Sequence, residues 1–278
     1  MASNLLDDTL EGVFQAVLDP APDELLIVNP SVDTIETLVA VANSVPELPR
    51  IRLLGDESVL KPVRSNFMLA STLANLIEDD TLAIRALPAH HDHNARKNSL
   101  LVLPTEVVAL VTAGDTVAGL LTDDAEFVSA ANAVYMSAWD EAADFPLRTP
   151  AFSRMQMTLA SEFGESVEAD FTGVLDSLAT ARGDDDDTGL DTVEISLLVA
   201  AKHEVQLYDI SNWGEDVGLA SRATISRTKT RLENRGLLAT EKVPVDVGRP
   251  RMRLQFADDR LADASTEQLA SVAQTLLS

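Results

Sequence analysis

A short stretch near the C-terminal end constrains the fold of this chain more than any other feature. The segment Ala220–Gly236 has the sequence ASRATISRTKTRLENRG, with serine where a helix N-cap is favoured and glycine where a left-handed C′ residue is favoured. On a helix of 3.6 residues per turn, Ile225, Thr228 and Leu232 share one face, so this stripe is expected to point inward. The sequence therefore predicts one amphipathic helix whose opposite face stays accessible.

The accessible face of this helix carries small, hydroxyl-bearing and basic side chains. Its members are Ala223, Ser226, Arg227, Thr230 and Arg231, with Arg222 and Lys229 on the flank and Ser221 and Thr224 at the start. Small residues permit close approach to the floor of the DNA major groove, where arginine can pair with guanine. We therefore take these nine residues as candidate DNA contacts of a recognition helix.

The preceding segments predict the other helices of a helix-turn-helix. The expected elements are a helix over Asp191–His203, a short strand at Leu207-Tyr208, a second helix over Ile210–Val217 capped by Asp209, and a turn at Gly218-Leu219. The expected inward residues are Val193, Leu197, Ala200 and Ala201 on the first helix, and Ile210, Trp213 and Val217 on the second.

The following segments predict a wing. A strand is expected over Leu238–Val243, a tip over Pro244–Pro250 and a returning strand over Arg251–Phe256. Arg251 and Arg253 alternate with Met252 and Leu254, which is the two-residue period of a half-buried hairpin. The candidate DNA contacts here are Lys242, Arg249, Arg251 and Arg253. Helix order, turn and hairpin together favour a winged helix-turn-helix over a plain helical domain with incidental arginines.

The charge of the chain is distributed unevenly. With 21 Lys and Arg against 45 Asp and Glu, the formal net charge is −24. Between Lys202 and Arg253 ten basic residues stand against seven acidic ones, a local charge of +3, whereas the remainder holds eleven basic and thirty-eight acidic residues. Such an acidic chain has no general affinity for nucleic acid, so the locally basic module indicates a specific DNA-binding face.

The same composition also indicates in which cellular compartment the protein is expected. Acid richness, few aromatic residues and five lysines among the 21 basic residues are typical of a halophilic protein, because molar salt shortens the Debye length to about 3 Å and screens self-repulsion. Cysteine is absent, and the N-terminal segment MASNLLDDTLEG lacks a signal-peptide pattern. No apolar run reaches the roughly 18 residues of a membrane span. We expect a cytoplasmic protein without disulfides or a membrane partner.

The N-terminal half shows short apolar runs bounded by proline, glycine, asparagine or aspartate. The runs are Glu24–Val28, Arg50–Leu54, Leu82–Leu87, Ser99–Leu103, Val107–Thr112 and Val117–Leu121. Continuous runs of this kind predict strands buried on both faces. Helices are expected over Val32–Val45, Val59–Ile77 and Asp123–Ala143, the last with Phe127, Ala130, Ala131, Val134 and Trp139 inward. This order predicts an α/β domain with a mixed sheet and flanking helices.

This order of elements resembles half of a phospholipase D-like domain, the fold that TrmB-type sugar regulators use as an effector sensor. The catalytic form of that domain carries the pattern H-x-K-x4-D on the strand that enters its hairpins. Here no histidine stands two residues before Lys97, and neither Val102, five positions beyond Lys97, nor the following Leu103 is an aspartate. We therefore expect a non-enzymatic domain without cofactor or metal, and the resemblance implies a small phosphorylated or acidic metabolite as its ligand.

A histidine-rich run and one strand arginine are the candidates for binding that ligand. The run His90-His91-Asp92-His93 is compatible with a metal or anion site or a pH-sensitive loop, but consecutive side chains seldom all point at one ion, which favours a solvated loop. Arg85 is compatible with either an acidic effector or a carboxylate of the chain itself. The candidate effector-binding residues are Arg85, His91, His93, Arg96 and Lys97.

Two further apolar stripes raise the question of assembly. The first stripe lies on the helical segment Phe152–Thr180, where a kink is expected at Gly164, and consists of Met155, Leu159, Phe163, Val167, Phe171, Leu175 and Leu178. The second lies on Ser265–Leu277, which opens with a capping-box pattern of Ser265 and Gln268. Its apolar residues are Leu269, Val272, Ala273 and Leu276. These stripes either close domain cores or pair with a second subunit. We favour a homodimer through at least one of them, since two-fold proteins match palindromic operators.

The domain organisation follows from these patterns. An α/β sensor-like domain is expected over residues 1–150, a helical linker or dimerisation segment over 151–182 and an acidic hinge over 183–190. The winged helix-turn-helix is expected over 191–257 and a C-terminal helix over 258–278. The hinge contains the run Asp184–Asp187, whose adjacent carboxylates repel one another and the DNA backbone.

The segment Leu207–Arg253 resembles the C-terminal part of the haloarchaeal TbsP-like transcriptional regulators. The residues that carry the resemblance are the turn GEDVG and the wing KVPVDVGRPR, and it continues through Phe163–Leu178 and Asp191–Glu204 and more loosely into the N-terminal domain. The resemblance implies an archaeal transcription factor of central carbon metabolism. It assigns no ligand or catalytic residue to this chain.

Two function classes remain open on the sequence. The first is a transcriptional regulator that binds double-stranded DNA as a dimer and senses a metabolite. The second is a metabolite-binding protein or a phospholipase D-like enzyme remnant whose winged helix mediates protein contacts. The basic wing and the arginines of the accessible helix face favour the first class.

Overall fold

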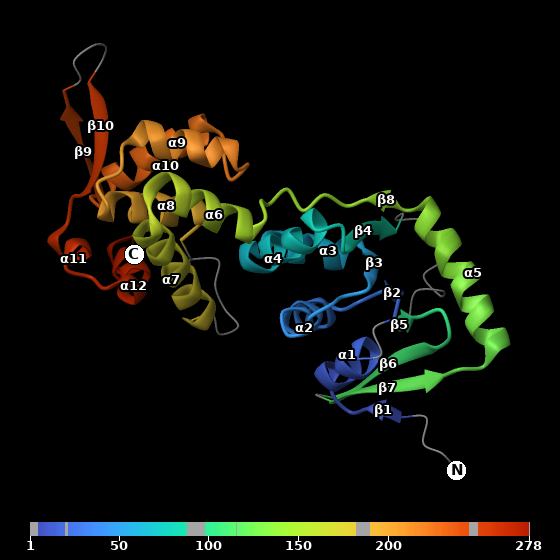
Figure 1. Ribbon diagram of the computed structural model, residues 1–278. Coiled ribbons are helices and arrows are strands. Elements are labelled where there is room, and N and C mark those ends of the chain that lie inside the picture. Colours follow the sequence, from blue (N-terminus) through green and yellow to red (C-terminus); the bar gives the residue numbers. More distant parts are fainter. Residues whose placement is uncertain are drawn as a thin grey trace. The chain divides into compact units, whose positions relative to one another are not determined.

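The computed structural model describes residues 5–19, 22–87, 98–114, 116–181, 190–244 and 250–277. The chain forms two compact units, Met1–Arg148 and Thr149–Ser278. Figure 1 shows the helices and strands of each unit. The expected acidic run Asp184–Asp187 lies outside the described residues.

Unit 1 is built on a mixed eight-stranded sheet. Its strands are β1 (Leu5–Asp7), β2 (Glu24–Val28), β3 (Arg50–Asp56), β4 (Leu82–Leu87), β5 (Ser99–Val102), β6 (Val107–Ala113), β7 (Thr116–Thr122) and β8 (Ala143–Asp144). Their order is β1-β7-β6-β5-β2-β3-β4-β8. The strands β2, β3 and β4 pair in parallel, whereas the hairpin strands and both edges pair antiparallel. The predicted α/β domain with a mixed sheet is confirmed.

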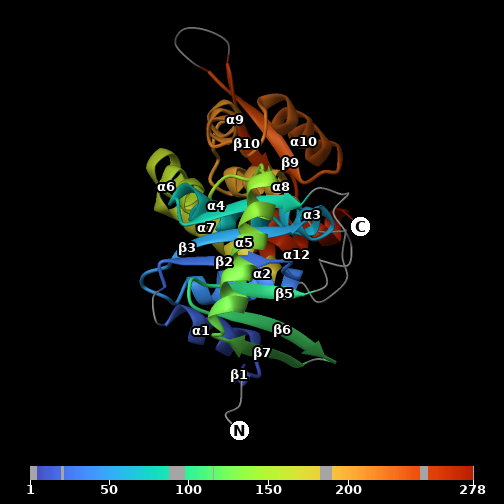
Figure 2. The same cartoon turned by 90° about the vertical axis from the view of Figure 1, so that its right-hand side faces the viewer.

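Helices cover both faces of this sheet. The helices α1 (Leu10–Leu18), α2 (Val32–Ala42), α3 (Glu57–Ser65) and α4 (Phe67–Glu78) lie on one face, and α5 (Ala125–Glu141) crosses the other, as Figure 2 shows. Because the central strands are covered on both sides, successive residues of β2 such as Leu25, Leu26 and Ile27 are all buried. The core under α5 joins Leu54 and Val102 of the sheet to the α5 residues that face them.

The segment predicted as one helix over Val59–Ile77 is two helices. Asn66 has an extended backbone, with φ −82° and ψ 103°, and ends α3 while starting α4. Its side-chain Oδ1 accepts a hydrogen bond from the Leu69 N–H at 3.3 Å, the N-cap interaction of α4. The apolar period runs through this break, so the pattern alone predicted a continuous helix.

The inward face of α5 differs from the predicted one. Phe127 and Val134 are 52% and 62% exposed, whereas Val128, Ala131 and Trp139 are buried against the sheet. The predicted Ala131 and Trp139 are buried, but the buried stripe begins at Val128 instead of Phe127, on a helix that packs against sheet strands including β4 and β5. The strands β6 and β7 are accordingly not buried on both faces, and Val111 and Leu120 are exposed.

Unit 2 is mainly helical. Its elements are α6 (Phe152–Phe163), α7 (Glu165–Ala181), α8 (Thr192–Lys202), α9 (Leu207–Asp216), α10 (Arg222–Asn234), β9 (Leu238–Val243), β10 (Arg251–Phe256), α11 (Asp259–Ala262) and α12 (Thr266–Leu277). The helix α8 packs against α7, α9, α10 and β10. It is therefore buried nearly all round rather than on the one predicted face, and Val193 of that face is only half-buried.

Most residues of the two apolar stripes considered for dimerisation are core of unit 2. Gly164, with φ +98°, separates α6 from α7, so the expected kink is a full break. Met155 and Leu159 of α6, Phe171 of α7 and Leu269 of α12 are buried within the single chain, and α7 packs against both α6 and α12. Because these side chains already have partners, they do not supply an exposed dimer interface.

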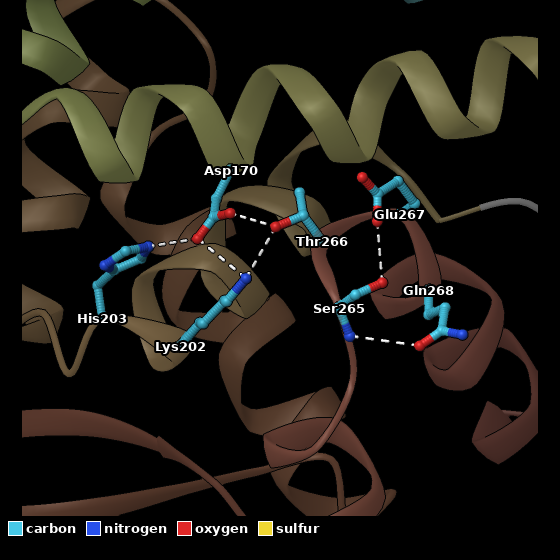
Figure 3. Close-up of polar contacts among 7 residues, drawn as sticks. All are labelled: Asp170, Lys202, His203, Ser265, Thr266, Glu267 and Gln268. Carbon is cyan, nitrogen blue, oxygen red and sulfur yellow. Dashed lines mark hydrogen bonds and ion pairs between the residues drawn. The ribbon is translucent and has the colours of Figure 1, made fainter.

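A polar cluster joins three helices of this core, as Figure 3 shows. Asp170 Oδ2 of α7 lies 2.6 Å from His203 Nε2 and 3.0 Å from Lys202 Nζ, at the end of α8. Thr266 Oγ1, in the first turn of α12, donates to Asp170 Oδ1 and accepts from Lys202 Nζ at 2.9 Å. Burial alone raises the pKa of Asp170, but the hydrogen bonds from Thr266, Lys202 and His203 together hold its pKa below the ordinary value. The cluster thus holds an ionised carboxylate between α7, α8 and α12.

Candidate nucleic-acid interface

The helices α9 and α10 form the helix-turn-helix predicted from the sequence. Gly218 lies in the turn with φ +83°, a conformation that glycine adopts without strain. A Cβ on Gly214 would lie 2.6 Å from Ile225 Cδ1, so glycine there permits the close approach of the two helices. Ile210 and Trp213 are buried as predicted.

The start of α9 differs from the prediction. Leu207-Tyr208 is not a strand, because α9 begins at Leu207 with Gln206 as its N-cap residue. Pairing with the wing is reduced to a single bridge between Gln206 and Arg253. Asp209 therefore does not cap α9 but lies in its first turn. There its negative charge interacts favourably with the positive end of the helix dipole.

The helix α10 has the predicted cap and the predicted inward stripe. Ser221 Oγ accepts a hydrogen bond from the Thr224 N–H at 3.2 Å, and Gly236, with φ +75°, follows the C-cap residue Arg235. Ile225, Thr228 and Leu232 are buried. Of the candidate contacts on α10, Ser221, Arg222, Ala223, Ser226, Arg227, Thr230 and Arg231 are exposed, and Thr224 and Lys229 are half-buried.

The wing strands have the predicted bounds. In their antiparallel register, Met252 stands opposite Lys242 and Arg253 opposite Glu241. Lys242 and Arg251 are exposed and Arg253 is half-buried, while Leu254 is buried against the module. Arg249 and most of the expected tip lie outside the described residues.

Several basic side chains of this face are held by carboxylates. Arg222 Nε lies 2.6 Å from Glu215 Oε2, and the two belong to α10 and α9. Lys229 Nζ lies 2.8 Å from Glu233 Oε2, one turn further along α10. Arg253 Nη1 lies 3.3 Å from Glu204 Oε2. These side chains are therefore neutralised before any ligand is present.

Arg231 has a role that the sequence pattern did not reveal. Its Nη2 lies 2.9 Å from Glu194 Oε1 and 3.4 Å from Asp191 Oδ2. Those two carboxylates form the capping box of α8, in which each side chain accepts a hydrogen bond from the other residue's backbone N–H. Arg231 thus links α10 to the start of α8, although its side chain is half exposed.

Arg227 differs from its neighbours. Its guanidinium donates to Ala223 O and to Thr224 Oγ1, both at 3.3 Å on its own helix. Within the described part of the chain, no carboxylate forms an ion pair with it. It is therefore an exposed cation held along the accessible face of α10.

A concave region lies beside α10. Between α9, α10 and the start of β10 is a cavity of about 480 Å³ lined by Leu207, Tyr208, Ser211, Asn212, Arg222, Ser226, Pro250, Arg251 and Met252. Arg251 Cζ lies 5.5 Å from the centre of the Tyr208 ring, and Arg251 Nη1 donates to Gln206 Oε1 at 3.1 Å. Sequence reasoning missed Tyr208 and Asn212, which lie one turn apart on α9.

The comparisons with protein families decide the relationship of this chain. A model described as the N-terminal domain of TbsP-like transcriptional regulators matches residues 2–150, and a model of their C-terminal helix-turn-helix domain matches residues 151–274. The chain belongs to the TbsP-like transcriptional regulators.

The remaining comparisons add one structural relative. Among solved structures, that of TrmBL2, described as an archaeal chromatin protein with a novel mode of DNA binding, is similar with a TM-score of 0.36 and 13% identity. The match covers 50% of this chain and 53% of TrmBL2, about half the length of each. None of the curated proteins matches the sequence.

In this TbsP-like chain, Arg85 is bound within unit 1. Its Nε donates to Asp144 Oδ1 at 3.1 Å, its Nη1 donates to the Trp139 carbonyl at 2.8 Å, and Cζ lies 4.8 Å from the centre of the Trp139 ring. Of the two alternatives, the structure shows pairing with a carboxylate, on the exposed edge strand β8. The other candidate effector residues, His91, His93, Arg96 and Lys97, lie outside the described residues.

The described residues show neither a metal cluster nor a membrane span. No group of three or more histidine, aspartate or glutamate side chains is arranged there to hold a metal ion. No helix in the described ranges is long and apolar enough to cross a bilayer.

Proposed function

We propose that this chain is a transcriptional regulator that binds double-stranded DNA sequence-specifically through α10 and the wing. The observation that carries the proposal is the division of α10 into two faces. Its apolar stripe is buried, while Ala223, Ser226, Arg227 and Thr230 are exposed beside a basic hairpin. A helix with small and hydroxyl-bearing side chains around an arginine fits the major groove, where arginine reads guanine.

Membership of the TbsP-like family supports a regulatory role without catalysis. The family resemblance also leads us to propose genes of central carbon metabolism as the targets. The segment around Lys97 lacks the histidine and aspartate of a phospholipase D-like active site, which further supports a non-enzymatic N-terminal unit. Phosphodiesterase activity that stays with the purified protein and is abolished by a mutation in this chain would contradict this part.

We also propose a homodimer on DNA. A single winged helix reads one half-site, and a two-fold dimer matches a palindrome whose half-sites lie about 34–36 Å apart. The interface must use surface other than the stripes of α6, α7 and α12, since these are core. The mass of the protein in solution, free and bound to its operator, tests this: a strict monomer in both states would contradict it.

A ligand of unit 1 is the remaining part of the proposal. One cavity of this unit, of about 450 Å³ between α5 and the outer hairpin, is lined mainly by apolar side chains, including Leu100, Phe127, Val134 and Tyr135. We propose a small metabolite as the ligand. Screening sugar phosphates and organic acids for a shift in melting temperature and in DNA affinity tests it, and no shift with any compound would indicate a scaffold role.

The experiment that tests DNA recognition is selection from a random-sequence duplex library, followed by binding measurements on the enriched sequence. A regulator of this kind enriches a defined, palindromic motif and binds it more tightly than a scrambled duplex of equal length. If no motif is enriched, the alternative that the winged helix mediates protein contacts is favoured.

A further inference from the structure

Two arginines line the cavity between α9, α10 and β10 on the candidate DNA face. Arg222 comes from the first turn of α10 and Arg251 from the start of β10, and both line this cavity. Their side chains are 53% and 47% exposed, so a ligand can reach both from solvent. Two guanidinium groups on one concavity are suited to an anion with several acceptor oxygens.

Each of these arginines already has a carboxylate beside it. Glu215 Oε2 lies 2.6 Å from Arg222 Nε, and Asp209 Oδ1 lies 3.7 Å from Arg251 Nη1. Both carboxylates belong to α9 and are partly exposed. They are therefore resident acceptors for the same guanidinium groups that would contact an incoming phosphate.

The other walls suit a nucleic-acid backbone. Ser226 supplies a hydroxyl group, the Tyr208 ring lies under Arg251, and Leu207 and Met252 are apolar. Hydroxyl and guanidinium groups are the side chains that most often hold DNA phosphates, while apolar walls fit the adjoining sugar.

We propose that this cavity seats a phosphodiester group of DNA and that Glu215 and Asp209 compete with it for Arg222 and Arg251. This inference rests on the proposed function. Binding then exchanges each carboxylate for a phosphate oxygen and leaves the carboxylate unpaired beside the DNA backbone. The exchange weakens affinity for every duplex alike, because phosphates carry no sequence information.

The competition has a signature in the salt dependence. An arginine that contacts a phosphate releases a condensed counterion, which makes the negative slope of log K against log salt steeper by about 0.9. Where a freed carboxylate recruits a cation from solution, part of that release is cancelled. Replacing the carboxylate by its amide therefore both tightens binding and steepens the slope.

The test uses the full chain, a random-sequence duplex of about 20 base pairs, or two helical turns, and fluorescence anisotropy over a series of KCl concentrations. The variants are Glu215→Gln, Asp209→Asn and the double variant. The matched control is Asp263→Asn, which removes the same charge at the end of α11, an element that packs on α12 and β10. Thermal melting at each salt concentration verifies that every variant is folded.

The expected result is a roughly two- to fivefold gain in affinity for each carboxylate removed, the range of an exposed ion pair, with a steeper salt slope. Asp263→Asn is expected to change the affinity and the salt slope by less than either of the other substitutions. The gain from Glu215→Gln should disappear in an Arg222→Ala background, because the competed side chain is then missing.

Two results would overturn the inference. If the folded amide variants match Asp263→Asn in affinity and slope while the parent chain binds the duplex, the carboxylates do not compete and only the inference fails. If neither the parent nor any variant binds DNA at any salt concentration at which the chain is folded, the proposed function fails with it.

Discussion

Trp213 of α9 donates its indole N–H to Thr158 Oγ1 of α6 at 2.9 Å. The indole is fully buried and meets Phe171 of α7 edge-on, with ring centres 6.2 Å apart. The helix-turn-helix is therefore anchored to α6 and α7, which belong to the same compact unit as the helix-turn-helix rather than to a separate linker.

Thr158→Val should destabilise unit 2. Valine keeps the shape of threonine but leaves the buried indole N–H of Trp213 without an acceptor, which costs about 1–3 kcal/mol of unfolding free energy. Denaturant titration followed by tryptophan fluorescence measures the loss. Thr158→Ser retains the hydroxyl group and is expected to retain most of the stability; equal losses in both variants would argue against the hydrogen bond as the cause.

Arg227→Ala should weaken binding to the selected operator without affecting the fold. We expect a loss of about 1–3 kcal/mol, the range for an arginine that pairs with guanine, and a relaxed preference at one base pair. The hydrogen bonds of the Arg227 guanidinium to the described residues are to Ala223 and Thr224 of its own helix, so the melting temperature should stay unchanged. Arg260→Ala on α11 removes the same charge elsewhere, and an equal loss there would mean that Arg227 acts only through net charge.

Replacing Arg249 and Arg251 by alanine should weaken binding to all duplexes to a similar degree. These wing residues flank Pro250, and we expect them to bind DNA phosphates, so the salt slope should fall by roughly one unit for each arginine that is replaced. Binding isotherms on operator and scrambled duplexes measure both effects. A reduction in affinity restricted to particular bases would show that the wing reads sequence.

Asp170→Asn should lower the free energy of unfolding and make that free energy less dependent on pH in the acidic range. The pKa of Asp170 is lowered in the folded state, so the ionised carboxylate contributes stability that is fully present above the unfolded-state pKa of about 3.9 and is lost as pH falls through the folded-state pKa.

At neutral pH the substitution removes the charge that Lys202 and His203 contact, at a cost of about 1–3 kcal/mol. Unfolding free energies of the two proteins, measured from neutral to acidic pH, should converge only below about pH 4. A constant difference down to the most acidic pH would contradict an ionic role for Asp170.

Much of the candidate interface could be predicted from local sequence. The cap at Ser221, the left-handed residue at Gly236 and the inward side chains of α10 depend on helix geometry, which acts over a few residues. The bounds of β9 and β10 were predicted correctly for the same reason, since alternation and flanking prolines are local features.

Other features depended on contacts between distant residues. The helix α5 carries apolar side chains on two overlapping stripes, and only its packing on β4 and β5 selects Val128 over Phe127 as the buried one. The N-terminal β1 and α1 were not predicted, because their burial depends on other segments: β1 pairs with β7, far along the chain, and α1 packs against α2. The break at Asn66 lies within an uninterrupted apolar period.

The sequence by itself determined the helix-turn-helix, the wing strands and the mixed α/β sheet, because periodicity, caps and turns are encoded by neighbouring residues. Only the tertiary structure decided that α7 packs against α6, α8 and α12 in the core of unit 2. It also decided which carboxylates hold the arginines of the candidate DNA face. Arg231 meets Glu194 across 37 positions, and charge patterning along one helix cannot reveal such a partner, because an ion pair depends on distance in space.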